Sequence, residues 1–160
     1  MAIQKRSLPT SAAPASLLAM LALAAPLVGH FEGKRNLPYW DSAHIRTVCR
    51  GHTGSIEERR YTDPECEAIF NVDLTSHAMG AAQCVPGIEN KPAIWAASAS
   101  LSFNIGVKRF CASSAARHFR TGNWRAGCTA LGAYQFAGGK RLPGLVRRRE
   151  AEVKLCLSGL

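Results

Sequence analysis

Three residues in the first third of the chain have the side chains that glycoside hydrolysis requires. Glu32, Asp41 and Thr47 are separated by nine and six positions. In this chemistry one carboxyl group protonates the leaving oxygen, while a group on the opposite face of the sugar positions or activates water. We expect Glu32 to be the acid, Asp41 to orient the water, and the Thr47 hydroxyl to be the hydrogen-bonding partner of Asp41.

The spacing alone has a second explanation, in which the three residues are only structural. Glu32 would then belong to a helix terminus, Asp41 to a turn and Thr47 to a strand, where these residue types are common. The catalytic explanation needs Glu32 to be buried against apolar side chains, because burial keeps a carboxyl group protonated at working pH. It also needs Asp41 to stay ionised, as it would at an exposed turn.

A small hairpin is predicted to position these three residues. Residues 37–40 and 45–49 are short extended runs with a polar turn between them. Asp41 then lies at the turn, Thr47 lies in the second strand, and Glu32 precedes the first strand. Folding the hairpin back would bring a carboxylic acid, a carboxylate and a hydroxyl to one cleft.

Helices are predicted for most of the remaining chain. Thr62 and Glu65 form a capping box with Pro64 in the first turn, which predicts a helix to about residue 82. Further helices are expected over residues 90–103, 112–119 and 124–131, and from residues 143–144 to residue 157. One hairpin followed by helices indicates an α+β fold.

Residues 7–29 form an uncharged apolar segment, which follows Lys5 and Arg6. It is long enough to cross a bilayer as a helix of about 20 residues, but its many alanines and three prolines make insertion weak. It could be a cleaved secretory signal, a permanent anchor, an anchor that inserts and later leaves, or a buried helix of the core. We expect a signal or anchor at residues 1–30 and a folded domain at 31–160.

Six cysteines in a small chain with an export-like start favour disulfide bonds formed outside the cytoplasm. We expect Cys84 to pair with Cys111, since the two flank one predicted helix. Cys128 is expected to pair with Cys156 across the turn at residues 138–139. For the two remaining cysteines, at positions 49 and 66, buried free thiols are an equal alternative.

The charge of the chain is strongly positive and unevenly distributed. The 160 residues include 20 Lys and Arg against 11 Asp and Glu, a formal net charge of +9, and 47% hydrophobic residues exclude intrinsic disorder. The excess lies after residue 116, and we expect Arg147, Arg148 and Arg149 to adsorb to an anionic polymer. No nucleic-acid module accompanies the basic region, so nucleic acid is not an expected partner. The five histidines have no metal-ligand spacing, so no metal site is expected.

Several separate motifs resemble those of the phage-type lysozymes, glycoside hydrolase family 24. They cover nearly all of residues 31–160 and occur in the family's order: Glu32-Gly33, Leu37-Pro38-Tyr39 before Asp41, Thr47, Gly51-His52-Thr53-Gly54, Phe103-Asn104-Ile105-Gly106, and the stretch from Ala137 to Glu152. The resemblance implies a lysozyme-like fold, with a small β-hairpin lobe and a larger helical lobe. It also implies catalytic roles for Glu32, Asp41 and Thr47, inversion at the anomeric carbon, and no cofactor.

The same resemblance supplies an expected substrate and location. It implies a monomeric endolysin that cuts the β-1,4 bond between N-acetylmuramic acid and N-acetylglucosamine in bacterial peptidoglycan. A subgroup, the signal-anchor-release endolysins, resembles this chain in its weakly hydrophobic N-terminus. That likeness implies an inactive form held in the host inner membrane through residues 7–29, facing the periplasm, and a soluble periplasmic form after release.

Two departures from the family pattern and two alternative functions remain. Cys49 and Arg50 stand where the family often has glycine and an aromatic residue, which affects the sugar subsites rather than the catalytic residues. A lytic transglycosylase would cleave the same bond with one acid, but would not need Asp41 and Thr47. A noncatalytic basic protein that binds cell walls or disrupts membranes would not need Glu32.

Overall fold

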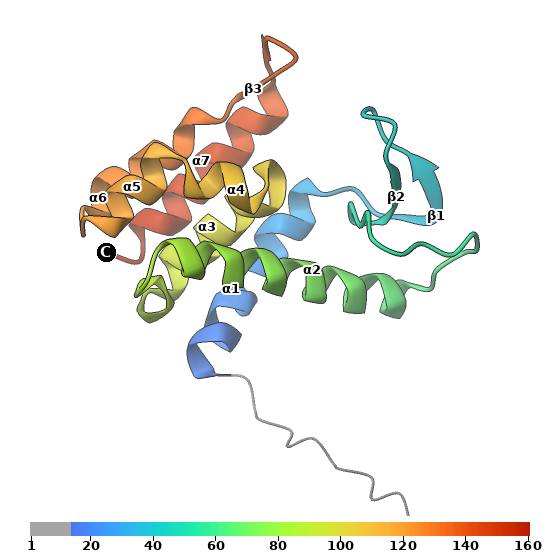
Figure 1. Ribbon diagram of the computed structural model, residues 1–160, viewed down its shortest axis with the longest axis horizontal. Coiled ribbons are helices and arrows are strands. Elements are labelled where there is room, and N and C mark those ends of the chain that lie inside the picture. The colour runs from blue at the N-terminus through green and yellow to red at the C-terminus, as the bar shows by residue number, and fades with distance from the viewer. Residues whose placement is uncertain (1–13) are drawn as a thin grey trace, which may run out of the picture.

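The computed structural model describes residues 14–160 and has an α+β fold with two lobes, as expected (Figure 1). A small antiparallel hairpin lies at one end of the molecule, and helices form the rest. The expected basic flank of the N-terminal segment, Lys5 and Arg6, lies outside the described residues, as do residues 7–13.

The hairpin lobe contains strands β1 (Arg35–Trp40) and β2 (Arg46–Cys49), close to the predicted runs. Tyr39 pairs with Thr47, and the register shifts between Arg35 and Tyr39. The buried residues of this lobe form one small cluster: Val48, Cys49, Tyr61 and Cys66. Because so few side chains are buried, the lobe depends on links to the neighbouring helix.

Helix α2 (Asp63–Cys84) is that neighbour, and it runs from the hairpin lobe into the helical lobe (Figure 1). The predicted capping box is present: the Thr62 hydroxyl accepts from the Glu65 amide, and the Glu65 carboxylate accepts from the Thr62 amide. A disulfide joins Cys49 at the end of β2 to Cys66 in the first turn of α2. The free-thiol alternative for these two cysteines is therefore wrong.

The helical lobe is packed around α3 (Pro92–Ile105), whose residues from Ile94 to Ser102 are all buried. Around it lie α4 (Val107–Cys111), α5 (Ser114–Arg120), α6 (Trp124–Ala130) and α7 (Pro143–Leu157), with short 3-10 turns at Ile88–Asn90 and Leu131–Ala133. Strands β3 (Phe136–Ala137) and β4 (Lys140–Arg141) form a second hairpin at the predicted glycine turn. Helix α4 was not predicted.

Two disulfides fasten the helical lobe, and both were predicted. Cys84 at the end of α2 is bonded to Cys111 at the end of α4. Cys128 in α6 is bonded to Cys156 in α7. The first bond ties α4 to the central helix α2, and the second ties the C-terminal helix α7 to α6.

Helix α1 (Ala15–Phe31) covers most of the segment that the sequence favoured as a signal or anchor. Its residues Met20, Ala24 and Val28 are fully buried in the core of the helical lobe. In this conformation the segment is thus a core helix, the least favoured of the four sequence interpretations. Within residues 14–160, no helix combines the length and the apolar character needed to span a membrane.

Candidate active site

Glu32 lies at the junction of the two lobes, directly after the last turn of α1. Its backbone is extended, and its amide donates to the Val28 carbonyl as the helix ends. The Glu32 side chain is 23% exposed and lines a pocket of about 520 Å³ together with Asn104, Leu142 and Arg147. A carboxyl group placed there can reach a molecule bound in the pocket.

The Glu32 carboxylate is paired with a guanidinium group instead of being surrounded by apolar side chains. Arg148 Nη1 donates to Glu32 Oε1 over 2.6 Å. The sequence reasoning expected apolar neighbours for this carboxyl group and did not anticipate a guanidinium partner. The pair connects the end of α1 with α7, two elements that are 116 positions apart in sequence.

The arginines expected to adsorb to an anionic polymer differ in exposure. Arg147 is exposed. Arg148 is 3% exposed and Arg149 is fully buried, and both form ion pairs with the fully buried Glu152. Buried guanidinium groups cannot meet a polymer at the surface, which corrects the expectation for Arg148 and Arg149.

Burial shifts the ionisation of this inner pair of charges. Removal from water raises the pKa of the Glu152 carboxyl group, and the neighbouring guanidinium groups oppose that shift. Removal from water also lowers the pKa of the Arg149 guanidinium, while the charges of Glu152 and Glu32 act in the opposite direction. Both shifts have the same cause, because each charged form is poorly solvated in the core.

Asp41 lies at the hairpin turn, as predicted. Its Oδ1 accepts hydrogen bonds from the amides of Ala43 and Ile45, over 2.9 and 2.8 Å. The Asp41 amide in turn donates to the Ile45 carbonyl. The carboxylate is therefore held by backbone donors, which fix its direction.

Thr47 lies in β2, six residues after Asp41, and is buried with 3% exposure. Its hydroxyl donates to the Ile45 carbonyl over 2.9 Å. The Thr47 hydroxyl is thus bonded to the Ile45 backbone and not, as the sequence had predicted, to the Asp41 carboxylate. Asp41 and Thr47 share Ile45 as a backbone partner at the end of the hairpin.

Among the described residues, no hydrogen bond joins Glu32 to Asp41 or Thr47. Glu32 belongs to the helical side of the junction, and the other two belong to the hairpin. Gly51 passes close to the Glu32 carboxylate, since a Cβ at Gly51 would lie 3.9 Å from Glu32 Oε2. Gly51 also lines a second pocket, of about 300 Å³, with His52, Asp73 and Phe103. Glu32 therefore lines the first pocket, and Gly51, which lies close to its carboxylate, lines the second.

Arg50 is a residue of the site that the sequence reasoning missed. Its Nη1 donates to the carbonyls of Gly29 and Glu32, over 3.0 and 3.3 Å. Its Nη2 pairs with Glu67 on α2 over 3.1 Å. Arg50 thus fastens the backbone on which Glu32 stands to the hairpin and to α2. The signal in the sequence was a charged residue where the family often has an aromatic one.

His52 has a structural role. Its Nδ1 lies 2.8 Å from Asp73 Oδ2, which ties the end of the hairpin to α2. Across residues 14–160, no group of three or more His, Cys, Asp or Glu side chains is arranged to hold a metal ion.

Comparison with known families gives one match over most of the chain. The model of the family described as phage lysozyme matches residues 29–152. That range includes Glu32, Asp41, Thr47 and the buried arginines.

Curated relatives and solved structures agree with this match. The SAR-endolysin of Enterobacteria phage P21 is 35% identical over 130 residues, which cover 80% of this chain and 78% of the relative. The active form of the P1 phage endolysin Lyz has a TM-score of 0.75 at 24% identity, covering 93% of this chain and 97% of that one. The secreted inactive form of Lyz has a TM-score of 0.57 at 20% identity, covering 91% and 95%.

Proposed function

The chain belongs to the phage lysozyme family, and we propose that it hydrolyses the β-1,4 bond between N-acetylmuramic acid and N-acetylglucosamine in bacterial peptidoglycan, as a monomer. The observation that carries this proposal is the position of Glu32. Its carboxyl group lines a pocket at the lobe junction and is held by Arg148. The hairpin supplies the second carboxylate and the hydroxyl that the reaction requires.

In the proposed reaction, Glu32 gives its proton to the glycosidic oxygen as the bond to the anomeric carbon breaks. Water attacks that carbon from the opposite face, and its proton passes to Asp41. The backbone amides on Asp41 hold its carboxylate in one direction, and we assign the Thr47 hydroxyl to help position the water. Attack from the opposite face inverts the anomeric carbon. No cofactor is needed, because water is the only co-reactant.

The first test removes the acid and keeps its shape. Glu32→Gln is expected to abolish hydrolysis of purified cell walls, since an amide cannot donate a proton to the leaving oxygen. Glu150→Gln is the matched control, because it removes the same charge at an exposed position. Full lysis by Glu32→Gln would contradict the proposal and favour a noncatalytic wall-binding or membrane-disrupting protein.

The products separate the proposed hydrolase from a lytic transglycosylase. Mass spectrometry of digested peptidoglycan should show reducing ends that have gained water. An early NMR spectrum should show the α-anomer at the new reducing end, as inversion requires. Anhydro ends would instead identify a transglycosylase, and a β-anomer would identify a retaining reaction.

We further propose that residues 7–29 hold an inactive form in the host inner membrane before the chain reaches the described conformation. If the segment spans the bilayer, Glu32 stands three residues from its outer edge, within roughly 10 Å even when extended. It could not then meet Arg148 and the hairpin. Two findings support this order: α1 is a core helix here, and the fold is more similar to the active form of Lyz than to its inactive form.

The test of this proposal follows the intact chain in a bacterium. Before membrane depolarisation we expect the protein in the membrane fraction, with Met1 still present and little lytic activity. After depolarisation it should be found, uncut, in the soluble periplasmic fraction. A mature protein that starts near residue 25 before any depolarisation would contradict release and establish a cleaved signal.

A further inference from the structure

The charged side chains behind Glu32 form a network that the proposed reaction does not use directly. The charge network, as we call it, consists of Glu32, Arg148, Arg149 and Glu152, with Ser100 as a neutral member. Glu152 is its innermost carboxylate and is fully buried. Burying a charge is unfavourable unless the charge is paired and hydrogen-bonded, and an apolar residue would fill the same space at a smaller free-energy cost. A buried charged network therefore points to a role other than stability.

Glu152 holds Arg148 from the side opposite to Glu32. Arg148 Nε donates to Glu152 Oε1 over 3.3 Å, and Arg148 Nη1 donates to Glu32 Oε1 over 2.6 Å. Arg148 Nη2 donates to the Ser100 carbonyl over 3.1 Å. Three donors of one guanidinium are thus engaged in three directions, which leaves the group one orientation toward Glu32.

Glu152 is itself fixed by two other groups. The Ser100 hydroxyl donates to Glu152 Oε1 over 2.6 Å, and Arg149 Nη2 donates to the same oxygen over 2.8 Å. Arg149 Nη1 continues to the side-chain oxygen of Asn104, over 3.1 Å. Since Asn104 lines the same pocket as Glu32, the network reaches the pocket at two points.

We propose that Glu152 is a positioning residue for the acid of this reaction: it holds Arg148 against Glu32, and its negative charge offsets that of Arg149. This inference rests on the function proposed above. With Glu152 in place, the groups near Glu32 are two guanidinium groups and one carboxylate, which together carry a net charge of +1. Without it, Glu32 faces two uncompensated positive charges.

Other charged groups near Glu32 do not replace this balance. Arg50 reaches the Glu32 backbone carbonyl, and its guanidinium is paired with Glu67. His30 and Arg147 line the pocket beside Glu32. Within the described residues, Glu152 is the carboxylate that forms ion pairs with both buried arginines.

The first test is Glu152→Gln, which keeps the shape and removes the charge. Two uncompensated guanidinium groups would stabilise the Glu32 carboxylate, so the proton needed for catalysis is lost at lower pH. We expect the alkaline limb of the pH profile of kcat/KM to move down by about one unit, which is about tenfold in rate on that limb. Glu150→Gln, on the exposed side of the same helix, should leave the limb in place.

The second variant separates the positioning of Arg148 from the net charge near Glu32. It remains informative if Glu152→Gln fails to fold. Arg149→Met with Glu152→Gln removes a buried pair together, so the net charge facing Glu32 is unchanged. We expect the alkaline limb near its wild-type position, a several-fold lower kcat because a neutral amide holds Arg148 Nε less firmly than the Glu152 carboxylate does, and an unchanged KM. Thermal melts by circular dichroism establish that each variant is folded.

The outcomes distinguish this inference from the proposed function. Wild-type protein that fails to hydrolyse cell walls would overturn the function. Active wild-type protein with a folded Glu152→Gln variant, whose alkaline limb stays in place, would overturn the positioning role alone. An unchanged kcat in the folded double variant would overturn it as well.

Discussion

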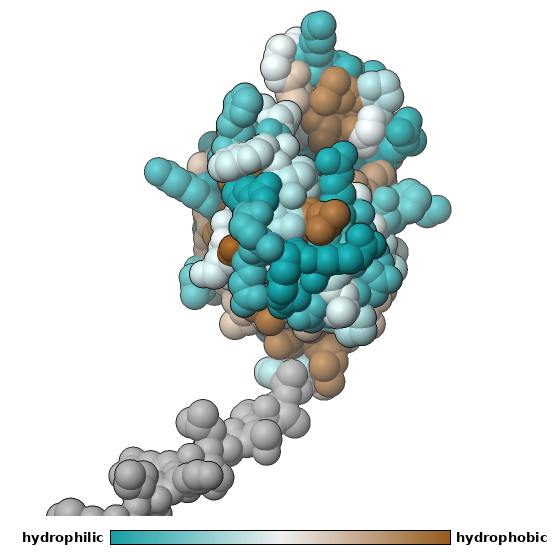
Figure 2. All heavy atoms as spheres, turned by 90° about the vertical axis from the view of Figure 1, so that its right-hand side faces the viewer, coloured by the Kyte–Doolittle hydropathy of each residue, from teal (hydrophilic) through white to brown (hydrophobic). Residues whose placement is uncertain are grey.

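The two lobes use charge in opposite ways. In the hairpin lobe, ion pairs lie at the surface, such as Lys34 with Asp63 and Arg59 with Glu65. Figure 2 looks onto this end of the molecule, and hydrophilic residues cover most of it. In the helical lobe, Arg148, Arg149 and Glu152 form their pairs below the surface.

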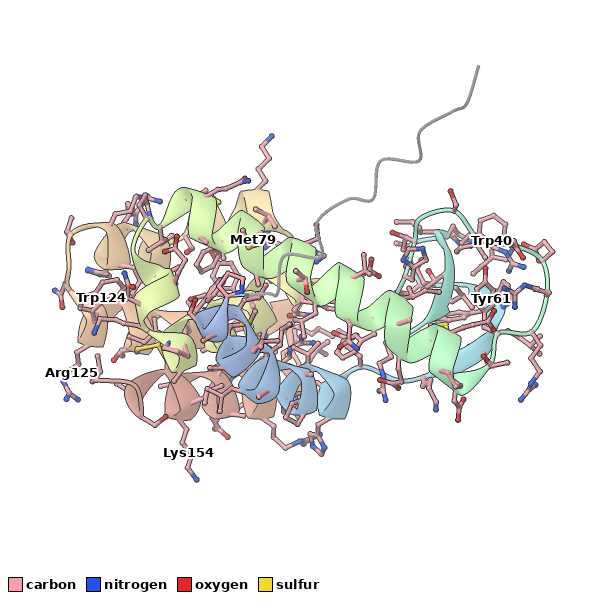
Figure 3. The ribbon with its side chains drawn as sticks, turned by 90° about the horizontal axis from the view of Figure 1, so that it is seen from below. Trp40, Tyr61, Met79, Trp124, Arg125 and Lys154 are labelled. Carbon is pink, nitrogen blue, oxygen red and sulfur yellow. A yellow bond between two sulfur atoms is a disulfide. The ribbon has the colours of Figure 1, made fainter. Side chains whose placement is uncertain are left out.

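The apolar cores of the two lobes also differ, in the number of side chains that they bury. The hairpin lobe buries one small cluster around Val48 and Tyr61, whereas the helical lobe buries a continuous core that includes Trp95, Phe110 and Phe119. Figure 3 shows Trp40 and Tyr61 at the hairpin end, and Trp124, Arg125 and Lys154 at the other.

This difference matters for the site because the proposed catalytic residues are divided between the lobes. Glu32 is held by the helical lobe, through Arg148. Asp41 and Thr47 are held by the hairpin lobe, which has the smaller core. Stability and activity should therefore respond differently to changes in each lobe. A residue of the helical core should affect the whole molecule, and a residue of the hairpin lobe should affect the site first.

The largest effect is expected from a core residue of α1. Met20→Ala should lower the free energy of unfolding by about 2–5 kcal/mol, because a fully buried side chain leaves a cavity. Leu18→Ala on the exposed side of the same helix should cost about 0.5 kcal/mol or less. Chemical denaturation of the soluble form measures both. Equal costs for the two variants would show that α1 is not packed in the core in solution.

The hairpin disulfide should give the next largest effect. Cys66→Ala opens a loop with a sequence separation of 17, and the loss is expected to be about 3 kcal/mol. We expect hydrogen exchange to rise in the hairpin lobe, while the helical lobe stays protected. Uniform loss of protection in both lobes would contradict the comparison.

A second variant sharpens this prediction through the backbone of Cys49. Its φ is +59°, in the left-handed region that favours glycine. Without the disulfide, that bond no longer offsets the backbone cost. Cys49→Gly combined with Cys66→Ala should therefore be about 1 kcal/mol more stable than Cys66→Ala alone. A double variant that is less stable would show that the Cys49 side chain contributes through packing.

The N-terminal cap of α2 should have a smaller effect, confined to the start of the helix that joins the lobes. Thr62→Ala removes the hydroxyl that accepts from the Glu65 amide, at a cost of about 1 kcal/mol. Thr75→Ala is the control in the same helix, since its hydroxyl bonds only within the helix, to the Asn71 carbonyl. Urea unfolding should detect a loss in the first variant alone.

Much of the fold was predictable because local signals agreed with the tertiary structure. The strands around Asp41, the capping box at Thr62 and the helix after Pro143 all follow from residue type and spacing. Two disulfides also followed from the order of the helices. Helix α4 was missed because Gly106 ends α3 with a φ of +89° and a second helix begins at once.

The errors concerned burial, which a local pattern does not determine. An apolar run of alanine and leucine is compatible with lipid or with a protein core, so the sequence favoured a signal or anchor where the described conformation has a core helix. Arg148 and Arg149 were interpreted as a surface charge run. The available signal was Glu152, three and four positions further along α7, a spacing at which side chains on a helix meet.

The smallest expected effect comes from the exposed pairs of the hairpin lobe and depends on pH. Hydrogen bonds from Arg59 and Thr62 lower the pKa of Glu65 from 4.5 to about 2. Since the folded-state pKa is the lower one, this carboxylate stabilises the fold above about pH 4.5, and its contribution is lost as the pH falls toward 2.

Glu65→Gln should therefore be less stable than wild type at pH 6, and the difference should narrow by pH 2. Because Glu65 is at the surface, 0.5 M salt should reduce the difference at pH 6 as well. Thermal melts at the two pH values test this, with Glu150→Gln as the control outside the described ion pairs. A stability difference that is the same at pH 2 as at pH 6 would mean that Glu65 acts through the geometry of the helix cap and not through its charge. The surface ion pairs of the hairpin lobe would then contribute less to its stability than the disulfide does.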